Sequence, residues 1–261
     1  MTGSLHHWDP AQYLRFAGPR LQPALDLLAR IPNPRPKTVY DLGCGTGSIT
    51  RILAERWPDA RIVGIDGSAS MLDQARGGAH APNLTWIEAD LRRWQAEAPA
   101  DVVYSNAALH WLDDHESLFP RILSQLAPGG VLAVQMPRNF AAPSHTSLAA
   151  TVEAGPWRER LLPLLRRVPV VAPAVYHALL ATRTRRLDIW ETEYLHVLEG
   201  DNPVVEWTKG SALRPFLDKL DVPDRERFLA DYGARVRAAY PPERDGTTLF
   251  PFRRLFMVAE R

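Results

Sequence analysis

A glycine-rich turn is the first group of residues in this 261-residue chain whose spacing can build a ligand site. Asp41-Leu-Gly-Cys-Gly-Thr-Gly47 follows an apolar run and precedes a segment with helical spacing, so it lies where a strand turns into a helix. Glycines there permit positive φ angles and close approach of a ligand, and the helix N-terminus offers unpaired N–H groups. The spacing is G-x-G-x-G; in the G-x-G-x-x-G of dinucleotide folds the third glycine would stand at Ser48.

Acidic residues stand at three successive strand ends of the predicted sheet. Asp66 closes the second strand, 19 residues after the last glycine of the turn, where an acid can accept two hydrogen bonds from ribose hydroxyls. Asp90 follows the third strand, near the expected position of an adenine edge. Asp41 would repel a phosphate, but it would help to bind an amino-acid moiety. Together the acids and the turn predict a nucleoside ligand that carries an amino acid.

The elements that must position these groups alternate regularly in the first half of the chain. Strands are expected at 38–42, 61–66, 84–89, 101–106 and 131–135, with helical spacing between them. Such alternation implies βαβ units, a parallel sheet and right-handed crossovers. Asp113 and Glu116 resemble a capping box that opens a helix, and Ala127-Pro-Gly-Gly130 is expected to end it.

After Met136 the pattern changes. Prolines interrupt a Leu-rich and Arg-rich stretch over 140–186, and strands at 187–198 and 252–259 and helices at 204–220 and 224–240 follow. We therefore expect one α/β domain over 1–261, doubly wound around a mainly parallel, Rossmann-like, seven-stranded sheet. It has a core over about 36–136, an N-terminal helical cap over 8–32, a helical insertion or lid over 140–186 and C-terminal strands and helices over 187–261.

Composition excludes several classes of function. The 31 basic and 30 acidic side chains give a net charge of +1, which argues against a nucleic-acid binder or a polybasic membrane protein. Cys44 is the one cysteine, so neither a disulfide framework nor a multi-cysteine metal site is expected, and no spacing of His with Asp or Glu suggests a metal site. There is no apolar run of about 18 residues and no signal-peptide pattern, so we expect a cytoplasmic protein. Of the basic residues, 28 are Arg and three are Lys.

Four motifs together resemble the class I S-adenosylmethionine-dependent methyltransferases over residues 36–136. They are D-L-G-C-G-T-G, the acid closing the second strand, A-D-L after the third and S-N-A-A-L-H-W-L after the fourth. The resemblance implies S-adenosylmethionine as cofactor and S-adenosylhomocysteine as product. It places the glycine turn on the methionine portion, Asp66 on the ribose, Met71 on adenine, Asp90 and Leu91 at its amino edge, and Asn106 and Ala107 under the sulfonium. The implied cofactor-binding residues are Tyr13, Arg20, Asp41, Gly43, Cys44, Gly45, Gly47, Asp66, Gly67, Ser68, Met71, Ala89, Asp90, Leu91, Asn106 and Ala107.

A narrower resemblance covers nearly the whole chain. Trp8-Asp-Pro10, Ala133-Val-Gln-Met-Pro137, Gly210-Ser-Ala-Leu-Arg-Pro-Phe216 and Pro251-Phe-Arg-Arg-Leu-Phe256 are similar to segments of trans-aconitate 2-methyltransferases. That family forms the monomethyl ester of a small unsaturated tricarboxylic acid. A carboxylate is already a nucleophile at pH 7, so no general base or catalytic dyad is expected.

A substrate with three negative charges needs cations, and the planar fork of Arg suits carboxylates. The candidates are Arg214 and Arg254, then Lys209 and Arg253, with Trp8 and Trp111 as pocket walls. Tyr13 and Arg20 are expected to close over the cofactor, and no metal is expected.

Other functions remain open at this stage. One alternative is a carboxyl methyltransferase for another acid, such as a malonyl group on a carrier protein, although the charge balance shows no docking patch. Another is a non-enzymatic S-adenosylmethionine sensor, and an NAD-dependent dehydrogenase is disfavoured by the glycine spacing. The methylated carboxylate, the mobility of the 140–186 insertion and the oligomeric state, expected to be a monomer or weak homodimer, are not fixed by the sequence.

Overall fold

The structure is a computed structural model that describes residues 17–33, 35–78, 81–166 and 170–261. The chain groups into two compact units. The first contains Arg138–Val168 and Glu193–Arg253, and the second contains Arg20–Pro137, Pro169–Thr192 and Arg254–Arg261.

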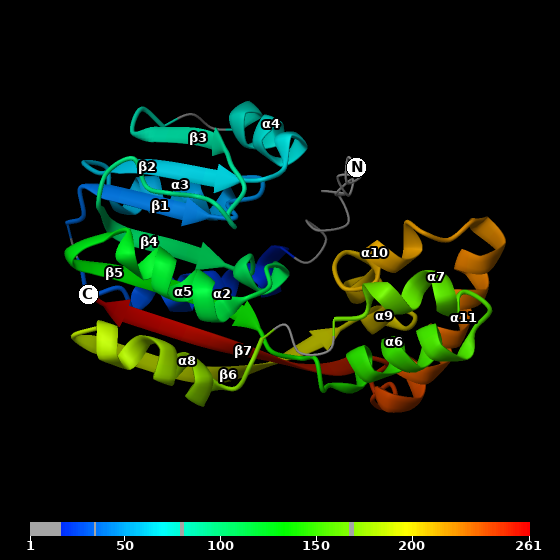
Figure 1. The fold of residues 1–261 in the computed structure, drawn as a ribbon. Helices are drawn as coiled ribbons and strands as arrows, with labels where there is room; N and C mark the ends of the chain where they lie inside the picture. Colours follow the sequence, from blue (N-terminus) through cyan, green and yellow to red (C-terminus); the bar gives the residue numbers. More distant parts are fainter. Residues whose placement is uncertain (1–16, 34, 79–80, 167–169) are drawn as a thin grey trace. The chain divides into compact units, whose positions relative to one another are not determined.

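A seven-stranded sheet in the order β3-β2-β1-β4-β5-β7-β6 organises the second unit (Figure 1). The strands β1 to β5 pair in parallel, and β7 runs antiparallel to β5. The expectation of a doubly wound, mainly parallel, seven-stranded sheet is therefore confirmed. The strands are β1 Thr38–Leu42, β2 Arg61–Asp66, β3 Leu84–Glu88, β4 Ala100–Asn106, β5 Leu126–Pro137, β6 Arg186–Leu198 and β7 Thr248–Glu260.

Helices cover both faces of this sheet. In Figure 1, α2 and α3 lie on one face, and α5 and α8 lie on the other. The central strands are buried on both sides and therefore carry near-continuous apolar runs, as in Ile62 to Ile65. The helices of this unit are α2 Ala17–Ala29, α3 Ser48–Arg56, α4 Ala69–Gly77, η1 Leu109–Trp111, α5 His115–Ser124, α8 Pro173–Leu180 and η3 Ala181–Arg183.

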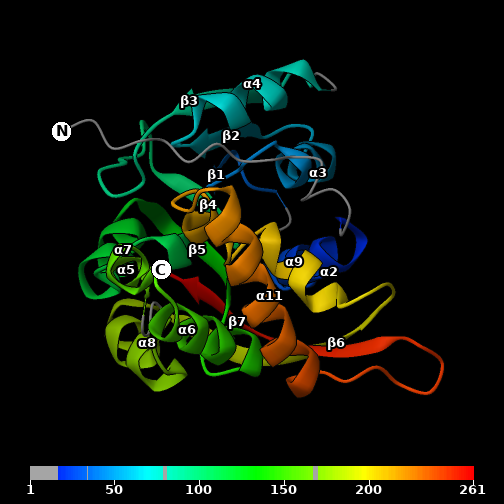
Figure 2. The same cartoon turned by 90° about the vertical axis from the view of Figure 1, so that its right-hand side faces the viewer.

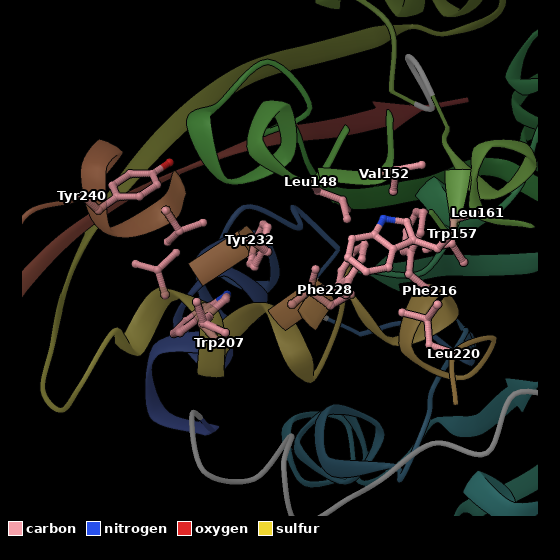
Figure 3. Packing of buried hydrophobic residues seen from close by; sticks show 14 of the residues in the cluster. Leu148, Val152, Trp157, Leu161, Trp207, Phe216, Leu220, Phe228, Tyr232 and Tyr240 are labelled. Atoms are coloured by element: carbon pink, nitrogen blue, oxygen red, sulfur yellow. The ribbon is translucent and has the colours of Figure 1, made fainter. Parts of the chain in front are cut away.

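The first unit is mainly helical and has a core of its own. The helix α11 packs against α6 and α9 (Figure 2). Trp157 and Phe228 belong to the buried cluster of this unit and meet edge to face at 5.2 Å between ring centroids (Figure 3). Its helices are α6 Pro143–Ala154, α7 Arg158–Leu161, η2 Leu162–Leu164, α9 Pro203–Lys209, α10 Arg214–Leu217 and α11 Val222–Ala239.

Three expected element boundaries are wrong. The single helix expected over 204–220 is two short helices, because Gly210 ends α9 and Pro215 lacks the N–H that a continuous helix would need. The cap of α5 is Asp114, one residue later than expected, and its side chain accepts from the Ser117 N–H at 3.3 Å. The Ala127–Gly130 segment does not end a helix but belongs to β5, where Gly129 adopts a φ of 78° and its N–H bonds the Arg261 carbonyl.

Candidate functional site

A cavity of about 610 Å³ opens at the carboxyl ends of β2 and β3, within the second unit. Ligands of open α/β sheets bind at this edge. Seven of the residues predicted from the sequence line it: Gly43, Asp66, Gly67, Ala89, Asp90, Leu91 and Trp111. The other lining residues are Glu88, Arg92, Ala108, Leu112 and Asp113. Sequence reasoning missed Arg92, which adjoins the A-D-L motif without belonging to it, and it considered Asp113 only as a helix cap.

The glycine turn is folded tightly against the end of β2. The Gly43 and Cys44 N–H groups both donate to the Ile65 carbonyl, at 2.7 and 3.0 Å. The φ angle of Gly43 is +76°, and a Cβ there would lie 2.1 Å from the Cβ of Ala108. Only glycine fits this position, so the turn can pass directly against the segment that follows β4.

The side chains of Trp86 and Arg51 pack against the same turn. A Cβ on Gly47 would lie 2.2 Å from the Trp86 ring, and one on Gly64 would lie 2.5 Å from it. The Arg51 guanidinium lies 5.5 Å from the Trp86 ring centroid and donates to the Thr46 carbonyl at 3.0 Å. The two glycines therefore make room for an indole that fixes the turn. Sequence reasoning missed both supporting residues, because neither stands in a motif.

Asp66 lies at the centre of the site. Its carboxylate accepts the Gly45 N–H at 2.8 Å and the Ser68 N–H at 2.9 Å, so three of the predicted residues come together. Burial raises the pKa of Asp66, and the backbone N–H groups partly oppose that shift. Ser68 caps α4 by accepting from the Met71 N–H at 3.4 Å. Met71 itself is half-buried and is not among the residues that line the cavity.

Asp41 and Cys44 lie behind the cavity surface. Asp41 is 2% exposed and accepts the Thr50 hydroxyl at 2.7 Å, which ties the turn to α3. Burial raises the pKa of Asp41 to about 7; the Thr50 hydrogen bond opposes the shift and the charge of Asp66 adds to it. Burial, followed by the charges of Asp41 and Asp66, also raises the pKa of the Cys44 thiol. The thiol therefore stays protonated at neutral pH.

Asp90 lies at the mouth of the cavity in an ion pair. The Arg92 guanidinium lies 2.8 Å from its carboxylate, and the Arg92 backbone N–H donates to the same group at 2.9 Å. These hydrogen bonds lower the pKa of Asp90. Asp90 is therefore ionised at neutral pH and faces the cavity beside a cation.

The segment after β4 carries the remaining predicted residues of this unit. Ala107 has a φ of 52° although it is not glycine, and its N–H donates to the Gln135 carbonyl at 2.9 Å. A non-glycine residue held there stores strain that its surroundings must support. The Asn106 Oδ1 is buried and has no hydrogen-bond partner within the described part of the chain. Trp111 is 47% exposed at the cavity wall.

The predicted cations fall in both units. In the second unit, Arg254 is 5% exposed and donates from Nη1 to the Gln135 Oε1 at 3.4 Å. Three lie in the first unit: Lys209 pairs with Glu206 at 2.6 Å, Arg214 lies 3.7 Å from Asp218 and Arg253 lies 3.4 Å from Glu193. Trp8, Tyr13 and the side chain of Arg20 lie outside the described residues, and the Arg20 backbone belongs to α2.

Two features are absent from the described residues. Within them, no three His, Cys, Asp or Glu side chains are grouped as metal ligands would be. None of the described helices combines the length and the apolarity that crossing a membrane requires.

Comparison with known proteins gives a consistent result. The family described as a methyltransferase domain matches residues 39–130. The chain is 49% identical to trans-aconitate 2-methyltransferase of Azoarcus sp. (strain BH72), over 97% of this chain and 99% of that one. It is 47% identical to the trans-aconitate 2-methyltransferase of Streptomyces coelicolor, over 100% of this chain and 89% of that one.

Solved structures share the fold. A phosphoethanolamine N-methyltransferase 2 of Haemonchus contortus in complex with S-adenosyl-L-methionine gives a TM-score of 0.59 at 17% identity, over 96% of this chain and 56% of that one. An S-adenosylmethionine-dependent methyltransferase from Mesorhizobium loti gives 0.51 at 21% identity, over 94% of this chain and the whole of that one.

The fold, the cavity and these likenesses define a class I S-adenosylmethionine-dependent methyltransferase. Its cofactor is S-adenosylmethionine. Within this class, the chain belongs to the trans-aconitate 2-methyltransferase family.

The residues present fit this cofactor. The cavity is bounded by a glycine turn, by a carboxylate at the end of β2 that can meet ribose hydroxyls, and by an ionised carboxylate after β3. The buried Asn106 Oδ1 adds an oxygen acceptor two residues before the cavity-lining Ala108. Oxygen acceptors suit a ligand that carries ammonium and sulfonium charges.

Proposed function

We propose that this enzyme methylates a carboxylate of trans-aconitate and releases the monomethyl ester and S-adenosylhomocysteine. The observation that carries this proposal is the full-length likeness, at 44–49% identity, to relatives named for that reaction. That likeness covers 97–100% of this chain and so extends well beyond the methyltransferase-domain match at 39–130.

The positions of the side chains support the cofactor-binding roles that the resemblance implies. When bound, S-adenosylmethionine supplies an electrophilic methyl group on a positively charged sulfur. Asp66 accepts from the ribose hydroxyls, and Asp90 with Leu91 meets the amino edge of adenine, since all three line one cavity. The backbone of the glycine turn meets the methionine portion, with Asp41 fixing the turn through Thr50. The buried Asn106 Oδ1, which has no hydrogen-bond partner within the described part of the chain, would be the oxygen near the sulfonium charge.

On the acceptor side, the enzyme needs no base. A carboxylate with a pKa of about 4 is ionised at pH 7, so the protein's task is to hold it, to align it and to exclude water. Arg254 is proposed to bind a carboxylate of the methyl acceptor, and it belongs to the same unit as the cavity. Lys209, Arg214 and Arg253 are proposed as further cations, and Trp111 as a wall of the pocket.

The test is a methyl-transfer assay with purified protein and methyl-labelled cofactor. We expect labelled monomethyl ester from trans-aconitate above a no-enzyme control, and weaker turnover of a dicarboxylate that lacks one of the anionic groups. Turnover of a carrier-bound malonyl group in place of trans-aconitate would assign the enzyme to a different acceptor. Cofactor binding without turnover of any acid would contradict an enzymatic role.

A further inference from the structure

A row of polar side chains crosses three adjacent strands of the second unit. Asn106 on β4 pairs in register with Gln135 on β5, so both side chains lie on the same face of the sheet. Gln135 in turn pairs with Phe256 on β7, and Arg254, two residues earlier on β7, shares that face. Gln135 and Arg254 are buried inside their strands, and Asn106 is half-buried at the end of β4. Polar residues are unusual inside strands that are buried on both sides, so Gln135 and Arg254 need an explanation.

Gln135 connects the two ends of this row. Its backbone carbonyl accepts the N–H of Ala107, the strained residue directly before the cavity-lining Ala108. Its side-chain Oε1 accepts from Arg254 Nη1 at 3.4 Å. One residue therefore contacts both the segment beside the cofactor cavity and the cation proposed for the acceptor.

Stability alone does not account for glutamine at this position. Gln135 is 0% exposed, and its Nε2 has no hydrogen-bond partner within the part of the chain that the structure describes. A buried N–H without a partner costs stability, so an apolar side chain of the same length would suit the fold better. The amide oxygen, in contrast, holds the guanidinium by one hydrogen bond without adding a negative charge next to it.

We propose that Gln135 is a positioning residue for the methyl acceptor: it orients Arg254 through a neutral oxygen, so that the guanidinium is presented to a carboxylate of the substrate. This inference rests on the proposed function. A glutamate at the same place would hold Arg254 equally well, but it would put a negative charge where the acceptor's own charge must be attracted.

Gln135→Glu separates this role from a structural one. If Gln135 only fixes the fold, a carboxylate beside Arg254 forms an ion pair and leaves both the KM for trans-aconitate and the Tm unchanged or improved. If it positions Arg254 for the acceptor, we expect the KM for trans-aconitate to rise at least tenfold while the Kd for S-adenosylhomocysteine stays within about twofold. Calorimetric titration of trans-aconitate into protein saturated with S-adenosylhomocysteine gives the same comparison without turnover.

A double-mutant cycle and a matched control complete the test. Gln135→Met removes the oxygen, and we expect it to raise the acceptor KM several-fold in the native background but to add little to Arg254→Gln, because the two residues act as one unit. Gln125→Glu makes the same chemical change at the C-cap of α5, where Gln125 Oε1 accepts the Ala96 N–H, and it should leave the KM for trans-aconitate unchanged.

The outcomes distinguish this inference from the proposed function. Native protein that methylates trans-aconitate while Gln135→Glu keeps the native acceptor KM and Kd overturns the positioning role alone. Native protein that neither binds nor methylates trans-aconitate overturns the proposed function and the positioning role with it.

Discussion

At the residue scale, burial disfavours the ionised form of the Asp41 carboxyl group. Burial raises its pKa to about 7 in the folded chain, far above the value of about 3.9 in an unfolded one. Between about pH 4 and about pH 7, Asp41 is therefore protonated in the folded protein but ionised in the unfolded chain. The contribution of Asp41 to stability is therefore fully present below about pH 4 and is lost as the pH rises through about 7.

Asp41→Asn tests this linkage. The asparagine can still accept the Thr50 hydroxyl but does not titrate, so we expect it to reduce the fall in unfolding free energy between pH 5 and pH 8. Urea denaturation at several pH values gives the measurement. Asp245→Asn is the control. Hydrogen bonds from Thr247 lower the pKa of exposed Asp245, so this group does not make the unfolding free energy depend on pH between 5 and 8. An unchanged slope in Asp41→Asn would contradict the assigned pKa.

The glycine turn offers a matched pair of substitutions. Gly43 and Gly45 have φ angles of +76° and +55°, but a Cβ would clash only at Gly43; at Gly45 nothing lies within 4 Å. Gly45→Ala should cost about 1–2 kcal/mol for the left-handed backbone. Gly43→Ala should cost about 1–3 kcal/mol more for overpacking against Ala108. Chemical denaturation measures both; equal losses would mean that the contact with Ala108 has no energetic weight.

At the residue scale, the sequence predicts the acids better than their partners. Asp66 and Asp90 are recognisable because each follows a strand of clear apolar pattern, and both line the cavity. Arg92, Trp86 and Gln135 are not recognisable, because their importance depends on contacts made only in the folded chain. In a sequence with 28 arginines, nothing local distinguishes buried Arg254 from exposed Arg253.

At the scale of elements, a buried histidine joins η1, α5 and α8. His115 Nδ1 lies 2.6 Å from the Tyr176 hydroxyl, and its Nε2 lies 3.0 Å from the Leu109 carbonyl. If Nε2 carries the proton that Leu109 accepts, Nδ1 is left to accept from Tyr176. His115 therefore holds the η1 segment, which carries Trp111 at the cavity wall, to a helix of the 140–186 insertion.

Tyr176→Phe removes the hydroxyl and keeps the ring against Phe119. We expect a loss of about 1–3 kcal/mol in the free energy of unfolding, since a buried hydrogen bond to a polar partner is removed. Tyr40→Phe is the matched control: its ring is equally buried, but its hydroxyl contacts Ala98 only at 3.3 and 3.4 Å, and the loss should be smaller. An equal loss in both variants, measured by urea denaturation, would exclude a special role for the His115 contact.

The parallel strands were predictable as elements, and so was α11, which is expected over 224–240 and observed over Val222–Ala239, but the shorter helices after Pro137 were not. Strands β1 to β4 are short apolar runs bounded by glycine, proline or acidic residues, and the sequence predicts them within a residue or two. The shorter helices after Pro137 lack such a clear pattern, because prolines interrupt the segments that form them. The break between α9 and α10 depends on Gly210 and Pro215 together, which the apolar spacing of 204–220 conceals.

At the scale of the whole molecule, the two units have separate cores. Trp157 in the first is 3% exposed, donates from Nε1 to the Thr151 carbonyl at 2.9 Å and packs on Phe228 (Figure 3). Trp94 in the second is 6% exposed and packs edge to face on Tyr40 at 5.2 Å. These tryptophans give two comparable substitutions, one for each core.

We expect Trp157→Ala to cost about 3–5 kcal/mol and to act mainly on the first unit. Amide protons of α6 and α11 should then lose protection from hydrogen exchange, while those of β1, β2 and β4 keep theirs. The Kd for S-adenosylhomocysteine should stay within about twofold, because the lining of its cavity belongs to the second unit. Trp94→Ala should give the reverse pattern and weaken cofactor binding. If either variant lost protection equally in the helices α6 and α11 and in the strands β1, β2 and β4, the chain would unfold as one cooperative unit. Trp157→Leu repeats the comparison if the alanine variant does not fold.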